Sequence, residues 1–222
     1  MFGLDEHLAG LGTGQVFALV ALSAILLGLR HATDPDHLTA VVALLAGEQP
    51  DARRARRLGL VWGLGHATSL FAFGVPIVLY RAYLPLPVQT GAETAVGVLI
   101  VFLALRLLRR AHSHRHVAGA PARSARQAYG IGLVHGMGGS AGVGVLLLAA
   151  IPRHGEAIVA LGLFSAFTMV SMALASTGVG IAMSRDAVLR RYIAAVPAIA
   201  LVSLAFGVWY ALGALGAAPY LF

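Results

Sequence analysis

Residues 31–37, with the sequence His-Ala-Thr-Asp-Pro-Asp-His, place two imidazoles, two carboxylates and a proline in the otherwise apolar run 14–46. Ionisable side chains are costly to bury in a membrane, so such a cluster indicates a functional site. Imidazole and carboxylate groups without sulfur favour Ni²⁺, Co²⁺, Zn²⁺ or Cu²⁺ over Mg²⁺ and Ca²⁺, which prefer oxygen ligands. The cluster therefore predicts a site for a divalent transition-metal ion. Its candidate ligands are His31, Asp34, Asp36 and His37.

A regular helix cannot bring these side chains together. At about 100° per residue, Asp36 and His37 lie about 140° and 240° around the helix axis from His31. Pro35 has no N–H to donate, its ring clashes with the carbonyl four residues earlier, and the residue before a proline avoids helical angles. A straight helix over residues 14–46 would also measure about 50 Å, longer than the ~30 Å apolar core of a bilayer. The sequence therefore predicts a first helix that is broken at Pro35.

The residues around the break are typical of a helix start. Asp34 is expected to be the N-cap, followed by a proline in the first helical position of a short helix that runs through Ala46. We expect the break to free carbonyl oxygens near Arg30 and His31, which would serve as further ligands, as in broken transporter helices. The alternative is a capped helix start at the membrane edge, in which Arg30 pairs with Asp34 and the histidines have no role.

Two further histidines lie inside apolar segments. His66 follows Trp-Gly-Leu-Gly at 62–65, and we expect it to be a ligand or to support one, although a lone membrane histidine can also bond to a neighbouring helix. His135 begins the glycine-dense run 135–144, where close helix packing is the commoner role of the glycines. Both join the candidate metal ligands. The other histidines are expected to be solvated or incidental: His7, His154, His112, His114 and His116. The last three lie in a basic tract at 112–116, and whether they bind metal stays open.

The composition is that of an integral membrane protein. Hydrophobic residues make up 59% of the 222 residues and mean hydropathy is +0.83. Charged residues make up 11%, against about 25% in soluble domains. All sixteen basic residues are arginines, and the net charge of +7 reflects their placement between spans and not binding to nucleic acid. There is no cysteine, which excludes thiolate ligands, and we expect no signal peptide because Asp5 and Glu6 precede the first apolar run.

Six apolar segments predict an all-α, polytopic protein with a single membrane domain, residues 1–222. Residues 14–108 and 128–216 form two halves of three spans, joined by a cytoplasmic linker at 109–127. Arg-rich loops alternate with loops that are not, and because Arg excess marks the cytoplasmic side, both termini are expected outside the cell membrane. The predicted spans are Gly14–Ala46, Leu58–Tyr80, Gly91–Leu108, Ala128–Ile151, Ala157–Met183 and Tyr192–Leu215.

A weak repeat supports the division into halves. The sequence Gly-Leu-Arg-His-Ala at 28–32 is similar to Gly-Leu-Val-His-Gly at 132–136, and Gly-Leu-Gly-His-Ala at 63–67 has the same form. Three spans in each half would place the second half upside down in the membrane. This is the inverted-repeat arrangement of transporters that bind their cargo near the midplane. Chance similarity is the alternative, because Gly, Leu and Ala are abundant here.

Small hydroxyl side chains recur in the second and fifth spans. Thr68 and Ser69 can bond across helices or to backbone groups. In the fifth span a polar face is expected to serve helix packing, with the lining of a polar pathway as the alternative. Its residues are Ser165, Thr168, Ser171, Ser176 and Thr177.

The motif His-x4-Asp-His, followed by Leu-Thr-Ala-Val, resembles the signature of the nickel/cobalt transporter superfamily, and Leu-Gly-His-Ala-Thr at 64–68 resembles the motif of its next helix. The run 135–142 is similar to the shorter urease-accessory-type nickel permeases of that superfamily. The resemblance implies high-affinity movement of Ni²⁺ or Co²⁺ across the cytoplasmic membrane. It also implies selectivity ligands at His31, Asp36 and His37, with His66 assisting.

We therefore expect a permease and not an enzyme, one that takes up Ni²⁺, with Co²⁺ as a second cargo. No ATP-binding loop of the form Gly-x4-Gly-Lys is present, and inward movement of a dication is worth about 4.6 kcal/mol per 100 mV, twice the single-charge value. Two alternatives stay open, a Ni²⁺/Co²⁺ efflux protein and an intramembrane metal- or haem-binding enzyme. The metal ion is cargo, no resident cofactor is expected, and assembly into a homo-oligomer stays open.

Overall fold

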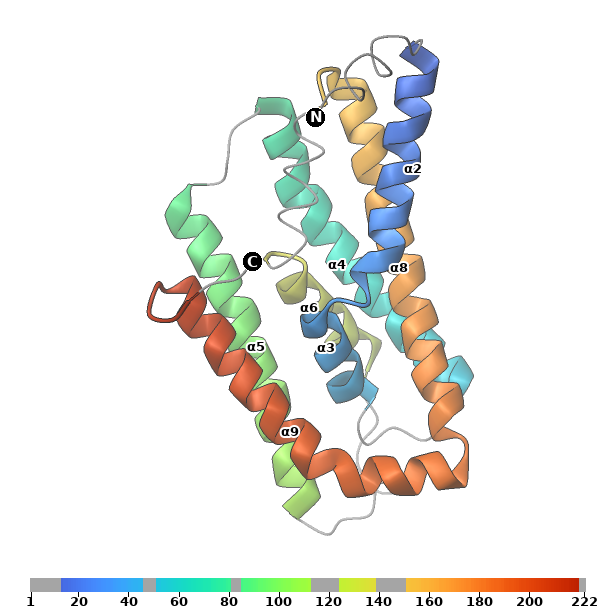
Figure 1. Cartoon of the computed structure of the whole chain (residues 1–222), viewed down its shortest axis with the longest axis vertical. Coiled ribbons are helices and arrows are strands. Elements are labelled where there is room, and N and C mark those ends of the chain that lie inside the picture. Colours follow the sequence, from blue (N-terminus) through green and yellow to red (C-terminus); the bar gives the residue numbers. More distant parts are fainter. Residues whose placement is uncertain (1–12, 46–50, 81–84, 113–123, 139–150, 220–222) are drawn as a thin grey trace, which may run out of the picture.

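The fold is built from helices, without strands, over the residues that the computed structural model describes, 13–45, 51–80, 85–112, 124–138 and 151–219. Three long helices, α2, α4 and α8, stand side by side, and α5 pairs with α9 (Figure 1). The short helices α3 and α6 lie between these two groups, near the middle of the molecule (Figure 1). The helices are α2 (Thr13–His31), α3 (Pro35–Leu45), α4 (Ala52–Tyr80), α5 (Leu86–His112), α6 (Ala125–His135), α8 (His154–Met183) and α9 (Asp186–Ala214).

Five of these helices, α2, α4, α5, α8 and α9, are long and apolar enough to cross a membrane. They coincide with the first, second, third, fifth and sixth predicted spans, which confirms an all-α polytopic fold. Several begin or end outside the predicted bounds. α4 starts at Ala52 and α9 at Asp186, because arginine is a good helix former and the basic segments continue the helices.

The fourth predicted span begins as α6. Its first turn is capped by Ser124, whose Oγ accepts from the N–H of Gln127 at 3.2 Å, while Gln127 Oε1 accepts from the N–H of Ser124. This reciprocal pair satisfies two donors that a helix start leaves free. Residues 139–150, the rest of that span, and most of the predicted linker 109–127 lie outside the described residues, and α5 extends to His112.

The first helix is broken where the sequence predicts it. α2 ends at His31, a turn follows, and Pro35 is the first residue of α3. In the first turn of α3 the N–H of Leu38 donates to the carbonyl of Asp34 at 3.0 Å. The expectation that the break frees the carbonyls of Arg30 and His31 was wrong. Arg30 O accepts from the N–H of Thr33 at 2.8 Å, and His31 O accepts from the N–H of Asp34 at 3.2 Å. The chain closes its own turn there with hydrogen bonds between residues three apart, as helix ends often do.

α4 and α8 form the centre of the helix packing. Gly59 lies against Ser176, and Gly180 lies against Ala55, so residue numbers rise along α4 as they fall along α8 and the two helices are antiparallel. A Cβ at Gly59 would lie 2.5 Å from Ser176 Oγ, and one at Gly180 would lie 2.6 Å from Ala55 Cβ. The missing side chains therefore allow the close approach.

Contacts between the two halves are reciprocal. α2 packs on α8 through Gly28, where a Cβ would lie 3.0 Å from the N atom of Thr168. α6 packs on α4 through Gly132, where a Cβ would lie 2.9 Å from the N atom of His66. Gly28 and Gly132 are the first residues of the two similar sequence segments, so the likeness of these segments has a structural counterpart. α4 continues through residues 63–67, and this third similar segment therefore does not end a helix.

A second reciprocal pair joins α5 and α9. A Cβ at Gly97 would lie 2.8 Å from the N atom of Ala211, and a Cβ at Gly207 would lie 2.9 Å from the N atom of Val101. In each helix a glycine packs against the other helix, and the backbone N atom that the other helix's glycine contacts lies four residues after it. This exchange is the pattern expected of two halves related by an inverted repeat.

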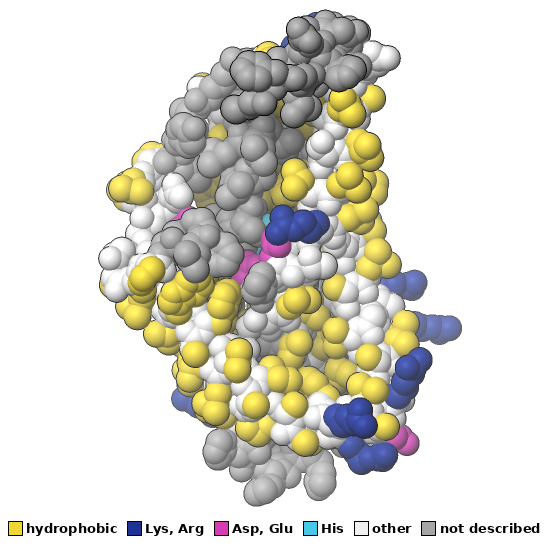
Figure 2. Space-filling view, viewed as in Figure 1, with side chains coloured by type: hydrophobic (Ala, Val, Ile, Leu, Met, Phe, Trp, Pro, Cys, Tyr) yellow, Lys and Arg dark blue, Asp and Glu magenta, His cyan; other side chains and the backbone are white. Residues whose placement is uncertain are grey.

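The outer surface is largely apolar. Hydrophobic side chains cover much of the visible face, and basic side chains gather at its lower end (Figure 2). α4 begins and α8 gives way to α9 at that end (Figure 1). Large apolar residues such as Leu174 and Val202 are 63% and 71% exposed, whereas four histidines are buried. A lipid environment explains this inversion of the usual pattern of soluble proteins.

Candidate metal centre

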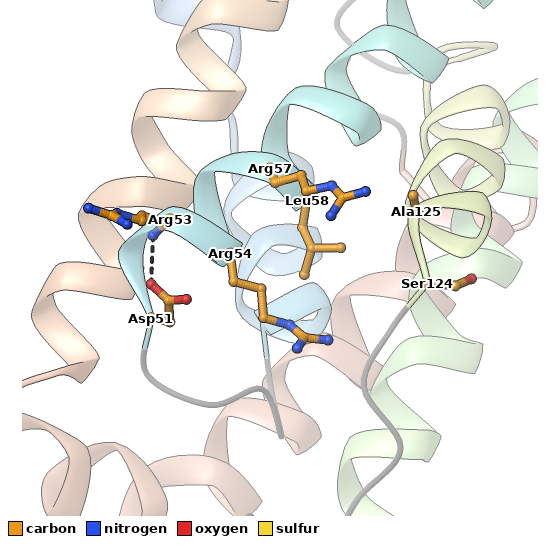
Figure 3. A pocket seen from close by; sticks show the side chains of 7 residues that line it. All are labelled: Asp51, Arg53, Arg54, Arg57, Leu58, Ser124 and Ala125. Atoms are coloured by element: carbon orange, nitrogen blue, oxygen red, sulfur yellow. Dashed lines mark hydrogen bonds between the residues drawn. The ribbon is translucent and has the colours of Figure 1, made fainter.

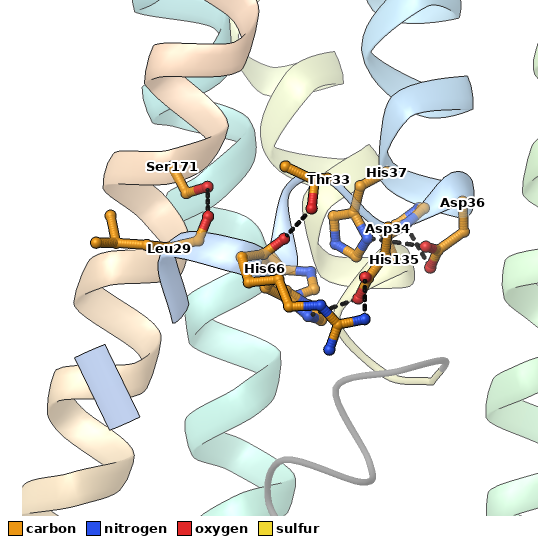
Figure 4. Close-up of polar contacts among 10 residues, drawn as sticks. Leu29, Thr33, Asp34, Asp36, His37, His66, His135 and Ser171 are labelled. Carbon is orange, nitrogen blue, oxygen red and sulfur yellow. Dashed lines mark hydrogen bonds and ion pairs between the residues drawn. The ribbon is translucent and has the colours of Figure 1, made fainter. Parts of the chain in front are cut away.

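Four buried histidines from four helices meet in the middle of the molecule. His31 is the last residue of α2, His37 lies in the first turn of α3, His66 lies inside α4, and His135 is the last residue of α6. His31 is 4% exposed and the other three are fully buried. Figure 4 shows His37, His66 and His135 close to Asp34 and Asp36, around the turn that separates α2 from α3.

Three of the imidazoles form one group of ligand atoms. His31 Nε2 and His66 Nε2 are 3.1 Å apart, and the ring centroid of His37 lies 4.3 Å from that of His31 and 5.1 Å from that of His66. One nitrogen from each ring lies within 4.8 Å of the others. Two nitrogens on opposite sides of one ion, at about 2.1 Å each, are about 4.2 Å apart. A small movement of the side chains would thus let all three bind the same ion.

Asp36, His37 and His135 form a second group, which shares His37 with the first. Asp36 Oδ1 lies 3.1 Å from His37 Nδ1, and its other oxygen, Oδ2, lies 3.3 Å from His135 Nε2. The second contact is within ion-pair distance but does not have hydrogen-bond geometry. Asp36 therefore stands between two imidazoles, one from its own helix and one from the other half of the chain.

Asp34 contacts the cluster from its edge. One carboxylate oxygen lies 3.4 Å from His31 Nδ1, and the other accepts from the guanidinium of Arg30 at 3.3 Å. The Arg30 side chain is 72% exposed, so this ion pair is weak. The pairing of Arg30 with Asp34 that the alternative interpretation expected is present, and the histidines beside it lie close together.

The electrostatics favour a cation. Asp34 and Asp36 supply two carboxylates, and both α2 and α6 end at the cluster, each with a partial negative charge of about one half. Among the described helices only α3 begins there, with the opposite partial charge. The positive partial charge of this one helix start is thus smaller than the combined negative partial charge of the two helix ends.

Aromatic side chains wall the cluster off. The ring of Trp62 lies 5.8 Å from those of both His37 and His135, and Phe164 lies 5.5 Å from His31, measured between centroids. Trp62 is fully buried and Phe164 is 2% exposed. Such walls exclude water and strengthen the charge interactions inside. Neither residue stands out in the sequence, because an aromatic residue in an apolar span normally indicates packing alone.

The donor set fits a borderline transition-metal ion. His37 Nε2, His66 Nδ1 and His135 Nδ1 are buried and have no hydrogen-bond partner within the described part of the chain. Buried polar groups are normally paired, so unpaired ring nitrogens beside carboxylates indicate a group that binds a ligand. Imidazole nitrogens with few carboxylates suit Ni²⁺, Co²⁺, Cu²⁺ or Zn²⁺.

The structure brings together all six candidate ligands from the sequence, and their role as ligands stays a prediction. The contact between Asp36 and His135 was not foreseen, because nothing in the sequence sets the distance between two spans ninety-nine positions apart (135 − 36). His154 is exposed at the start of α8. His7, His114, His116 and the side chain of His112 lie outside the described residues.

A separate pocket of about 500 Å³ lies between the start of α4 and the start of α6. Figure 3 shows Arg53, Arg54 and Arg57 around it, with Asp51 and Ser124 at its edges. Three guanidinium groups against one carboxylate repel a dication. The pocket is therefore not a second metal site.

Comparison with known proteins points to metal transport. Residues 17–115 match the family model described as NicO, high-affinity nickel-transport protein, and this range holds every candidate ligand except His135. The chain is 27% identical over 201 residues to the urease accessory protein UreH of Bacillus sp. strain TB-90, covering 83% of this chain and 86% of UreH.

Two shorter matches agree with the first. The nickel transporter NicT of Mycobacterium tuberculosis is 34% identical over 82 residues, which is 36% of this chain and 22% of NicT. A protein of Methanocaldococcus jannaschii, provisionally named a nickel/cobalt efflux system, is 29% identical over 99 residues, 44% of this chain and 46% of that protein. No solved structure matches the chain.

Proposed function

Since this chain belongs to the nickel/cobalt transporter superfamily, we propose that it is a permease whose cargo, Ni²⁺ with Co²⁺ as a second ion, passes through the buried histidine cluster. The observation that carries this proposal is the meeting of four imidazoles and two carboxylates where α2 and α6 end and α3 begins. The ligands would be His31, Asp36, His37, His66 and His135, with Asp34 orienting His31. The ion is cargo, and we propose neither a resident cofactor nor an enzymatic activity.

Uptake is the direction that we propose. The matched family is described as a high-affinity nickel-transport protein, and UreH, whose similarity extends over most of both chains, is named a urease accessory protein. A role in supplying nickel to a metalloenzyme suits both names. Inward movement of a dication is driven by about 4.6 kcal/mol per 100 mV of membrane potential, twice the single-charge value.

The proposed orientation rests on arginine placement. The start of α4 and the end of α8 lie together, because Gly180 packs on Ala55, and both adjoin Arg-rich segments. Arg excess marks the cytoplasmic side. We therefore propose that this end faces the cytoplasm, with both termini on the opposite side of the cell membrane.

Uptake of radioactive nickel tests this function directly. Cells that lack their own nickel transporters would express the wild-type chain, His37→Ala, or His154→Ala, an exposed histidine outside the cluster. We expect accumulation at trace concentration with the wild type and His154→Ala, and none with His37→Ala. Wild-type accumulation in the His37→Ala cells would remove the central claim.

The same cells separate uptake from the two alternatives. If the chain is an efflux protein, cells loaded with nickel will lose it faster when the chain is present, and they will accumulate less from the medium. If it is a haem-binding enzyme, the purified protein will show a Soret band in its optical spectrum. Either result would replace uptake as the function of the cluster.

A further inference from the structure

The last turn of α2 leaves the carbonyl of Leu29 without a backbone donor from the turn that follows. In a continuous helix the N–H of Thr33 would donate to the carbonyl of Leu29, four residues earlier. Here that N–H donates to Arg30 O at 2.8 Å instead. Leu29 O is met by the hydroxyl of Ser171, on α8, at 2.5 Å (Figure 4).

α6 ends in the same way. The N–H of Met137 donates to Val134 O at 3.3 Å, not to Leu133 O four residues earlier. Leu133 O accepts from the hydroxyl of Ser69, on α4, at 2.7 Å. The ends of α2 and α6 are thus each held by a serine from a helix of the other half of the chain.

Both hydrogen bonds are close to the cluster along the chain. Leu29 and Leu133 each lie two positions before the histidine that ends their helix, His31 and His135. The serines are buried, 6% exposed for Ser171 and 5% for Ser69. Both hydrogen bonds are part-buried, and a carbonyl that is held away from water without a donor is costly, so each bond fixes the turn from which an imidazole projects.

We propose that Ser171 and Ser69 are positioning residues for the metal cluster, which place the rings of His31 and His135 through the carbonyls of Leu29 and Leu133. The proposal rests on the function proposed above, in which the cluster holds Ni²⁺. Partners that orient metal ligands typically change metal affinity by about 10- to 100-fold when they are removed. The serines differ from such partners only in acting through the backbone.

The two serines could instead serve helix packing alone, and Thr177, another hydroxyl residue of α8, provides the control for that role. Its hydroxyl donates to Ala173 O, in its own helix, at 2.6 Å. Removing this hydroxyl disturbs α8 locally but breaks no bond to the end of α2 or α6. Thr177→Val, which keeps the shape of the side chain, is therefore the matched control for Ser171→Ala.

The test is a calorimetric titration of the purified full-length protein in detergent with Ni²⁺. Ser171→Ala and Ser69→Ala should each bind nickel about tenfold more weakly than the wild type, while Ser171→Thr, which keeps the donor, and Thr177→Val should bind as the wild type does. Equal affinity of wild type, Ser171→Ala and Ser69→Ala would overturn the inference alone. A wild type that binds no nickel would overturn the proposed function, and the inference with it.

X-ray absorption at the nickel edge separates positioning from general destabilisation. At saturating nickel, Ser171→Ala should show fewer imidazole ligands than the wild type, because His31 has lost its orientation. Weaker binding with an unchanged imidazole number would mean that the serine only supports the fold. If Ser171→Ala does not fold, Ser171→Cys, whose thiol is a weak donor, is compared with Ser171→Thr, and equal affinity of those two would overturn the proposal.

Discussion

His31 Nε2 and His66 Nε2 lie 3.1 Å apart, although one ring ends the broken first helix and the other projects from the middle of α4. The two atoms are at hydrogen-bond distance, and about 3.0 Å is also the distance between two ligand atoms at 90° to each other on an ion that each binds at about 2.1 Å. The pair therefore already has the spacing of two donors to one metal ion.

In the proposed site both rings bind one ion, so removing either should remove most of what the pair contributes. We expect His31→Ala and His66→Ala each to weaken nickel binding, and the double variant to be little weaker than the worse single one. Nickel titration of the four purified proteins measures this. Effects that simply add would show that the rings act at separate places.

Asp34 and Arg30 should differ sharply in importance. Asp34 lies 3.4 Å from His31 Nδ1, whereas the Arg30 side chain is 72% exposed. We expect Asp34→Asn to weaken nickel binding about tenfold, as for other partners of metal-binding histidines. Arg30→Gln should change it little, because exposed ion pairs contribute little. The same titration distinguishes the two, and a larger effect of Arg30→Gln would favour a helix cap over a metal site.

Gly132→Ala should destabilise the protein more than any exposed glycine change. An added Cβ would clash with the carbonyl oxygen of Trp62 and lie 2.9 Å from the N atom of His66. Both are backbone atoms of α4, which cannot move as the end of a flexible side chain can. We expect a loss of about 1–3 kcal/mol, the usual cost of overpacking. Gly130→Ala, in the same helix with nothing within 4 Å, is the control and should be neutral or stabilising. Thermal unfolding in detergent compares the two, and equal melting temperatures would contradict the packing of α6 on α4.

Pro35→Ala tests the break itself. The substitution restores a backbone N–H and removes the bias of Asp34 against helical angles. We expect α2 and α3 to be drawn toward one continuous helix, which would turn His37 about 240° away from His31, and nickel uptake to fall. The measurement is uptake at equal membrane abundance. Uptake unchanged from the wild type would show that the tertiary contacts of α3 alone maintain the break.

The break at Pro35 could be predicted because it depends on local sequence, and so could the likeness of residues 28–32 and 132–136. Proline acts on its immediate neighbours, and a five-residue motif is visible wherever it recurs. The carbonyl ligands were mispredicted for a local reason too, since the turn after His31 uses Arg30 O and His31 O for its own hydrogen bonds.

Other features could not be predicted because they depend on how distant spans pack. Ser171 looked like one of five small packing residues on α8, and only the structure places its hydroxyl on Leu29 O. The contact of Asp36 with His135 likewise needs the crossing of α3 and α6. The sequence shows which side chains can take part in such contacts but not which of them meet.

His37 belongs to both ligand groups, and this limits how many ions the protein can hold. A neutral imidazole offers one lone pair at a time, so the two groups cannot both be complete. Two dications about 5 Å apart would also repel each other by about 13 kcal/mol at an effective dielectric constant of about 20. In the proposed site the cluster would therefore hold one ion at a time, and a second ion would enter only after the first had left.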